Sequence, residues 1–150
     1  MSFKEAAELD FPGQYKQGLQ AVKGNDRNKF DFLKDTRNIN GSIDIDTALK
    51  KDFPHDNRWD YSIGYNENAY FFEVHPMIEK EIAVIIKKSL WLKSYLSDKA
   101  INLNKIKKNK CPFFWLSTES GCDIPQKSKK AKLLLDYNIE WRKTYIQKEF

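Results

Sequence analysis

Three residues that can do chemistry lie near the middle of the chain: Asp60, Glu73 and His75. The stretch that contains them, residues 59–75, has the composition of a β-hairpin. Side chains on a strand alternate between its two faces, so Glu73 and His75 point the same way and the hairpin can return Asp60 beside them. Two carboxylates and an imidazole on one face of a sheet can form a metal site or an acid–base pair. These three residues are therefore the candidate catalytic residues.

The hairpin is the most clearly marked element of the chain. Tyr, Ile, Phe and Val dominate two runs of strand length, which residues 66–68 (Asn-Glu-Asn) separate. Asn tolerates the left-handed conformations that tight connections require. Pro76 ends the second strand, because it cannot donate a hydrogen bond to the sheet, and it suits the first turn of a helix.

Helices are predicted on both sides of the hairpin. A long helix over about 77–97 carries an apolar stripe at intervals of three and four residues, made by Ile78, Ile82, Ile85, Ile86, Leu92 and Leu96. Shorter helices are expected over 14–23, ending at Gly24, and over 128–139, with one more short helix and a loop within 25–41. Residues 42–51 fit either a strand or a helical turn begun by an Asp cap.

The order of these elements predicts the fold class. Residues 112–118 form a continuous apolar run typical of a buried strand. A strand that leads through a long helix to another strand implies a crossover, so this strand should join the sheet beside the hairpin. With 150 residues, 41% of them hydrophobic, the chain can build one core. We predict a single α/β domain over residues 1–150, with a mixed β-sheet flanked by helices.

Basic residues are clustered along the chain, whose formal net charge is +5. Lysines gather around Lys107 and Lys108 and again around Lys129 and Lys130. Such patches suit phosphate backbones, since each neutralised phosphate releases a counterion. DNA or RNA is therefore one expected partner, and a protein is the alternative. The competing interpretation is that these lysines only keep the surface solvated.

Cysteine usage and hydropathy predict the compartment. Cys111 and Cys122 are the only cysteines, and their spacing does not match a zinc site or a redox motif. The most apolar run, residues 82–86, is far too short to span a bilayer, and the first residues lack the apolar core of a signal peptide. We expect a cytoplasmic protein with no membrane partner.

The chain resembles the PD-(D/E)XK nuclease superfamily, which has the restriction endonuclease-like fold. The resemblance is carried by Asp60 at the start of one strand and by Glu73-Val74-His75 on the next strand, ahead of a long helix, and it covers roughly residues 57–118. In that family an Asp and a Glu hold a divalent metal, and a Lys two residues after the Glu positions or activates the attacking water. His75 occupies that lysine position here, and Arg58-Trp59 stand where the family has a proline before the Asp, so the motif is degenerate.

The resemblance implies a metal-dependent phosphodiesterase that acts on DNA or RNA. Asp60 and Glu73 would hold Mg²⁺ or Mn²⁺ if the protein is active, and no cofactor is expected otherwise. Lys87 and Lys88, in the long helix, are candidates for the positive charge that the motif lacks. They join Lys107, Lys108, Lys129 and Lys130 as candidate nucleic-acid contacts.

Three alternatives stay open. The first is a non-catalytic module that binds nucleic acid or protein on a degenerate nuclease fold. The second is a metal-independent ribonuclease that uses Glu73 and His75 as base and acid. The third is a purely structural role, in which Asp60 bonds nearby backbone, Glu73 pairs with a lysine and His75 simply lies at a strand exit.

Overall fold

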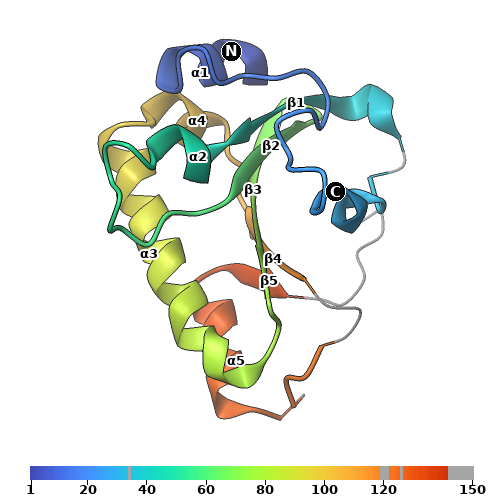
Figure 1. Cartoon of the computed structure of the whole chain (residues 1–150), viewed down its shortest axis with the longest axis vertical. Helices are drawn as coiled ribbons and strands as arrows, with labels where there is room; N and C mark the ends of the chain where they lie inside the picture. Colours follow the sequence, from blue (N-terminus) through green and yellow to red (C-terminus); the bar gives the residue numbers. More distant parts are fainter. Residues whose placement is uncertain (34, 119–121, 126, 142–150) are drawn as a thin grey trace.

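A five-stranded mixed sheet, built around the predicted hairpin, organises the molecule (Figure 1). The computed structural model describes residues 1–33, 35–118, 122–125 and 127–141. The strands are β1 (Ile39–Asp44), β2 (Tyr61–Tyr65), β3 (Asn68–His75), β4 (Phe113–Ser117) and β5 (Ile139–Trp141), and they lie in the order β1-β2-β3-β4-β5. The pairs β1–β2 and β2–β3 are antiparallel, whereas β3–β4 and β4–β5 are parallel.

The hairpin of β2 and β3 is confirmed, and its turn is tighter than predicted. Asn66 and Glu67 form a two-residue connection with φ values of 50° and 62°. Positive φ at both positions matches the right-handed twist of the flanking strands. Asn68 already belongs to β3, and pairs with Tyr65.

Within the described residues, five α-helices and three 3₁₀ turns accompany the sheet. The α-helices are α1 (Phe3–Asp10), α2 (Ile45–Leu49), α3 (Ile82–Asp98), α4 (Ile101–Ile106) and α5 (Lys129–Asp136). The 3₁₀ turns are η1 (Arg27–Phe30), η2 (Thr36–Asn38) and η3 (Glu79–Glu81). None of the helices within the described ranges is long and apolar enough to cross a membrane.

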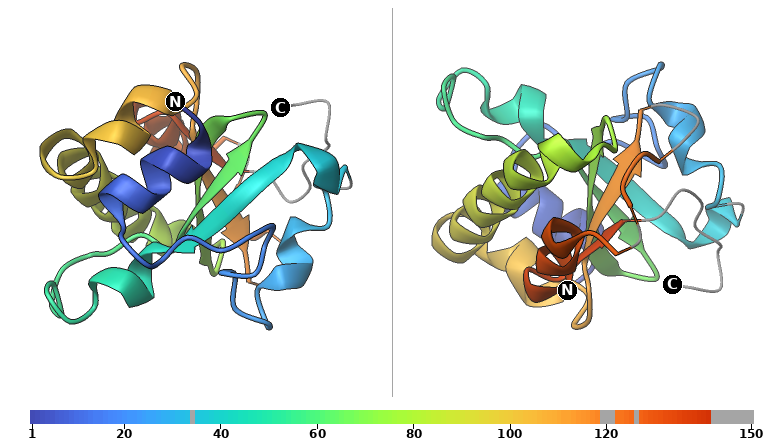
Figure 2. Two further views of the ribbon diagram at one scale, coloured as in Figure 1. Left: turned by 90° about the horizontal axis from the view of Figure 1, so that it is seen from above. Right: turned by 90° about the horizontal axis from the view of Figure 1, so that it is seen from below.

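The two faces of the sheet are covered differently. Helices α1, α3, α4 and α5 lie on one face, while the largely irregular segment between α1 and β1 covers the other (Figures 1 and 2). Phe71, Trp115 and Ile85 belong to the core under the helices. Phe72, Phe114 and Phe30 belong to the core on the opposite face. The alternation along β3 therefore decides which side chains meet α3.

Helix α3 presents an apolar stripe to the sheet, as the sequence predicts. Its buried residues are Ile82, Ile85, Ser89, Leu92 and Leu96. The helix begins later than expected, because β3 is followed by an extended segment and then by η3. The apolar strand over 112–118 is confirmed as β4, and the crossover through α3 and α4 places it parallel to β3.

Several predicted helices are wrong or incomplete. Residues 14–23 form turns instead of a helix, because Lys16 exchanges backbone hydrogen bonds with Ser42 of β1, and Gly18 has a φ of 51°. Residues 42–51 contain both alternatives, since β1 ends at Asp44, whose side chain caps α2. The predicted helix over 128–139 ends at Asp136, and the strand β5 that follows was not predicted.

Helix α1 was not predicted, although its start carries a recognisable signal. The Ser2 side chain accepts from the Glu5 N–H and donates to its carboxylate, which is the contact pattern of a capped helix start. At the other end, Asp10 caps α4: its Oδ2 accepts from the Leu103 N–H at 2.7 Å. Gly64 of β2 lies directly under the Phe3 ring, where a Cβ would stand 2.3 Å from the ring.

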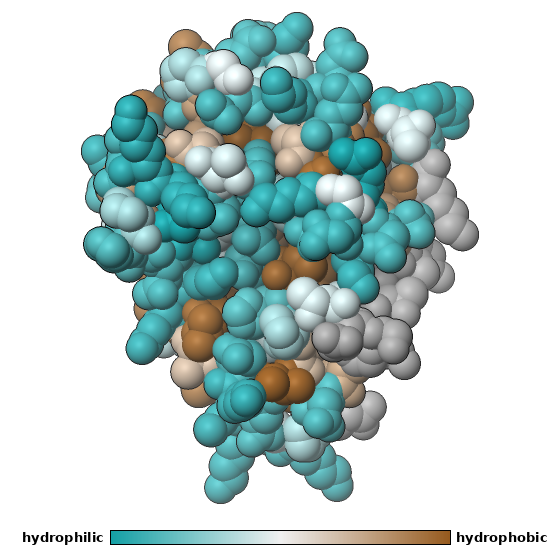
Figure 3. All heavy atoms as spheres, viewed as in Figure 1, coloured by the Kyte–Doolittle hydropathy of each residue, from teal (hydrophilic) through white to brown (hydrophobic). Residues whose placement is uncertain are grey.

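The face of the molecule seen in Figure 1 is mostly polar. In the face drawn in Figure 3, hydrophilic groups dominate and the hydrophobic groups are scattered among them.

Candidate functional site: an acidic pair with a helix lysine

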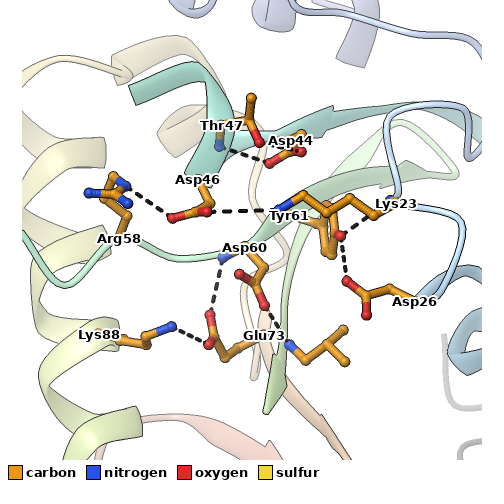
Figure 4. Close-up of polar contacts among 11 residues, drawn as sticks. Lys23, Asp26, Asp44, Asp46, Thr47, Arg58, Asp60, Tyr61, Glu73 and Lys88 are labelled. Carbon is orange, nitrogen blue, oxygen red and sulfur yellow. Dashed lines mark hydrogen bonds and ion pairs between the residues drawn. The ribbon is translucent and has the colours of Figure 1, made fainter. Parts of the chain in front are cut away.

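Asp60 and Glu73 lie beside each other at the point where β2 begins. Tyr61 pairs with Phe72 across the antiparallel hairpin, so the preceding Asp60 reaches the level of Glu73. The Asp60 backbone N–H donates to Glu73 Oε1 at 3.1 Å, and the Val74 N–H donates to Asp60 Oδ2 at 2.9 Å (Figure 4). Each carboxylate thus accepts a backbone hydrogen bond from the other strand, which fixes the position of both.

Lys88 completes the cluster from α3. Its ammonium group contacts Glu73 Oε2, and the three side chains point toward one another in Figure 4. The Glu73 side chain is 1% exposed and that of Lys88 is 17% exposed. Lys88 lies three residues after Ile85 and four before Leu92, so it falls within the stripe that faces the sheet. Lys87, one position away, is exposed.

His75 lies at the outer edge of this cluster. Its Nδ1 is 3.5 Å from Glu73 Oε2, and its Nε2 is 3.2 Å from Glu81 Oε2. The side chain is 22% exposed, so the imidazole stands between the buried Glu73 and solvent. The predicted convergence of Asp60, Glu73 and His75 is therefore present in the structure.

A further acidic residue, Asp46, lies beside the cluster, and it was not among the residues predicted from the sequence. Asp46, in the first turn of α2, accepts from Arg58 Nε at 3.0 Å and lies 4.0 Å from Lys23 Nζ. The Asp60 carbonyl oxygen accepts from the backbone N–H of Ile45 and of Asp46. The alternation Ile43-Asp44-Ile45-Asp46 was visible in the sequence, but nothing in it indicated that the chain after Asp44 would turn onto Asp60.

The protonation equilibria of the cluster are strongly shifted. Burial, followed by the neighbouring Glu73 carboxylate, raises the pKa of Asp60 to about 7, against the opposing influence of Lys88 and the Val74 N–H. The hydrogen bond to Glu73 raises the pKa of His75, with burial opposing it. Burial lowers the pKa of Lys88, but the interaction with Glu73 outweighs this effect and the net shift is upward. Below about pH 7 the Asp60 carboxyl is therefore mostly neutral, chiefly because it is buried.

The other predicted basic residues lie away from the acidic pair. Lys107 and Lys108 adjoin Ala69 at the start of β3, which is four residues from Glu73, or about 13 Å along the strand. Lys129 and Lys130 are exposed in the first turn of α5. Among the six candidate nucleic-acid contacts, the structure brings Lys88 into the cluster.

The contacts expected if these residues have a purely structural role are also present. Asp60 bonds the backbone of Val74, and Glu73 pairs with a lysine. Within the described part of the chain, no group of three or more His, Cys, Asp or Glu residues is arranged to hold a metal ion. Asp60 and Glu73 are the two acids that the cluster could offer to an ion.

Comparison of the chain with protein-family models, with curated proteins and with solved structures gives no match. The resemblance to the PD-(D/E)XK superfamily accordingly stays a prediction.

Proposed function

We propose that the protein is a metal-dependent phosphodiesterase of the nuclease class that acts on DNA or RNA. Asp60 and Glu73 would hold Mg²⁺ or Mn²⁺, and Lys88 would supply the positive charge that the degenerate motif lacks at His75. The observation that carries the proposal is the hydrogen-bonded cluster of Asp60, which directly precedes β2, Glu73 of β3 and Lys88 of α3. The same arrangement, two acids on paired strands ahead of a long helix and a further strand, is what the resemblance implies.

The donor set fits a hard divalent cation. Asp60 Oδ1 has no hydrogen-bond partner among the described residues, and both acids offer carboxylate oxygens. Mg²⁺ commonly binds through one or two carboxylates, together with waters and substrate phosphates, so a pair of acids is enough. The raised pKa of Asp60 fits as well, because a bound cation would supply the missing positive charge.

The residues of the cluster have separable roles in this proposal. A metal ion held here would lower the pKa of a bound water and stabilise charge on the phosphate. Lys88 holds the Glu73 side chain in place, and the Val74 N–H orients Asp60. His75, at the solvent side, can exchange protons with Glu73 through Nδ1. Lys88 and the Val74 N–H therefore act as positioning groups.

Charge outside the cluster supports a polyanionic substrate. The net charge of the chain is +5. Lys87, next to Lys88 on α3, is exposed to solvent. Lys129 and Lys130 are exposed on α5, which packs beside α3 (Figure 1). If these lysines contact the phosphate backbone, the affinity for nucleic acid should fall strongly as the salt concentration rises.

The test is cleavage of supercoiled plasmid, single-stranded DNA and RNA in Mg²⁺, in Mn²⁺ and in EDTA. Wild-type protein should cut at least one of these substrates only with metal, and Asp60→Asn and Glu73→Gln should lose roughly 100-fold or more of that activity. Lys88→Met should lose roughly 10–100-fold, as expected of a positioning residue next to a metal ligand. Asp136→Asn is the matched control, since Asp136 is exposed and is not one of the candidate site residues. Cleavage retained in both acid variants would sink the assignment.

Two alternatives are favoured by specific contacts. Glu73 is already satisfied by Lys88, His75 and the Asp60 N–H, which suits a non-catalytic module; salt-sensitive binding without cleavage would identify it. The 3.5 Å contact between Glu73 and His75 suits a metal-independent ribonuclease. That activity would persist in EDTA, show a bell-shaped pH profile and disappear in His75→Gln.

A further inference from the structure

A second concave site lies at the C-terminal half of α3, close to α4. It is a half-open pocket of about 350 Å³, at the lower end of the range for small-molecule sites, roughly 300–1,000 Å³. Its described lining comes from α3, α4, the segment between α4 and β4, the start of β4 and the turn before β5. Figure 1 shows α3 running between α5 and α4 along this side of the sheet. The lining does not include Asp60, Glu73 or Lys88.

Two lysines supply the charge of this pocket. Lys93 Nζ donates to the Tyr137 carbonyl at 2.7 Å and lies 5.2 Å from the centre of the Phe113 ring and 5.5 Å from that of Tyr137. Lys107 Nζ donates to the side chain of Asn104. Among the described residues neither lysine has a carboxylate within 4.0 Å, and the described lining contains no acidic residue.

The rest of the lining combines neutral polar groups with an apolar wall. Ser97 and three asparagines, Asn104, Asn109 and Asn138, can donate or accept hydrogen bonds. Leu96, Pro112 and Phe113 are the apolar residues. A pocket with a few polar groups on an apolar wall is the usual form of a small-molecule site, and ammonium groups without acidic partners select an anion.

We propose that this pocket binds a small organic monophosphate, with the phosphate between Lys93 and Lys107 and the organic part against Leu96, Pro112 and Phe113. The volume limits the occupant to one such molecule. The partial burial of Lys93, which lowers its pKa, is consistent with this role, because a bound dianion would favour its ammonium form. The proposal does not depend on the phosphodiesterase activity.

The pocket is also separate from the acidic cluster. Lys93 follows Lys88 by five residues on α3, and Lys107 pairs with Ala69 at the opposite end of β3 from Glu73. A ligand could therefore occupy the pocket without displacing any contact of Glu73.

The test is to titrate the protein with adenosine 5′-monophosphate, uridine 5′-monophosphate and ribose 5-phosphate. Binding is measured from the changes in amide chemical shifts in ¹H–¹⁵N NMR spectra. Inorganic phosphate and adenosine are the reference ligands. At least one monophosphate should give saturable shifts at Ser97, Asn104 and Asn109, and should bind more tightly than either reference. Lys107→Met and Lys93→Met should each weaken binding roughly tenfold or more, the loss expected for a charge-assisted hydrogen bond.

Lys105→Met is the matched control, because Lys105 is exposed on α4 and lies outside the pocket lining. It should bind like the wild type. Lys107→Met keeps the test valid if Lys93→Met fails to fold. The absence of saturable shifts with all three monophosphates, equal affinity for inorganic phosphate or adenosine, or unchanged affinity in folded Lys107→Met would each overturn the proposal.

Discussion

The ammonium group of Lys88 on helix α3 contacts the carboxylate of Glu73 on strand β3, and both side chains are largely withdrawn from solvent. This pair joins the long helix to the sheet at the level of Asp60. Because the pair is largely buried, removing one of the two charges would leave the other unpaired and destabilise the folded state.

Removal of Lys88 should destabilise the fold. Lys88→Met leaves the buried Glu73 carboxylate without its cation, and the free energy of unfolding should fall by about 3 kcal/mol. Urea unfolding followed by circular dichroism measures it. Lys87→Met, a change at an exposed neighbour, should alter it by less than about 0.5 kcal/mol. The double variant Glu73→Gln/Lys88→Met should recover part of the loss; equal losses in Lys88→Met and Lys87→Met would contradict the pairing.

Stability should fall as pH rises through the range in which Asp60 ionises. The folded protein keeps this carboxyl protonated up to about pH 7, whereas its ordinary pKa is 3.8, so below about pH 7 the folded state binds the proton more tightly. The stabilisation is complete below about pH 3.8 and is lost as pH rises to about 7, on the order of 4 kcal/mol in all. Asp60→Asn should remove this dependence. Urea unfolding from pH 4.5 to 8 tests it, and a constant difference between the two proteins would contradict it.

The imidazole of His75 should titrate above its ordinary range, chiefly because of Glu73. The chain has two histidines, His55 and His75, and a proton NMR titration follows the ring resonances of His75 separately. Glu73→Gln should lower the pKa of His75 more than Glu81→Gln does, since the Glu73 hydrogen bond is the larger cause of the shift. The opposite ranking would show that the Glu81 contact dominates.

Binding of Mn²⁺ should compete with protons at the acidic pair. Because Asp60 must ionise to bind a cation well, affinity measured by calorimetry should rise with pH up to about 7 and then level off. Asp60→Asn and Glu73→Gln should abolish the binding, and Asp136→Asn should leave it unchanged. Binding that is insensitive to pH or to both acid variants would place the ion elsewhere.

Period-two alternation together with the hairpin was enough to predict that Asp60, Glu73 and His75 lie close to one another. It put Glu73 and His75 on one face, and the hairpin turn brought Asp60 to them, because backbone pairing fixes register. Lys88 was predicted only as one of two helix lysines. Its place in the stripe, three residues after Ile85 and four before Leu92, distinguishes it from Lys87 in retrospect.

Elements that depend on distant partners were missed. Residues 14–23 have a helical pattern, but pairing of Lys16 with Ser42 overrides it. Strand β5 has three residues and is recognisable only beside β4. The helical turn begun by an Asp cap was one of the two predictions for residues 42–51, but the position of Asp46 beside Asp60 depends on backbone contacts between distant residues.

The cap that Asp10 places on helix α4 has a consequence for folding. The two partners, Asp10 and Leu103, are 93 positions apart in the sequence. The segment between them contains β1, β2, β3 and α3. During synthesis on the ribosome α1 emerges long before the helix that it caps, and it must wait without that partner. Contacts of such long sequence separation slow folding, since the loop-closure entropy is lost before the contact forms. A chain arrested before residue 103 would carry α1 without this restraint.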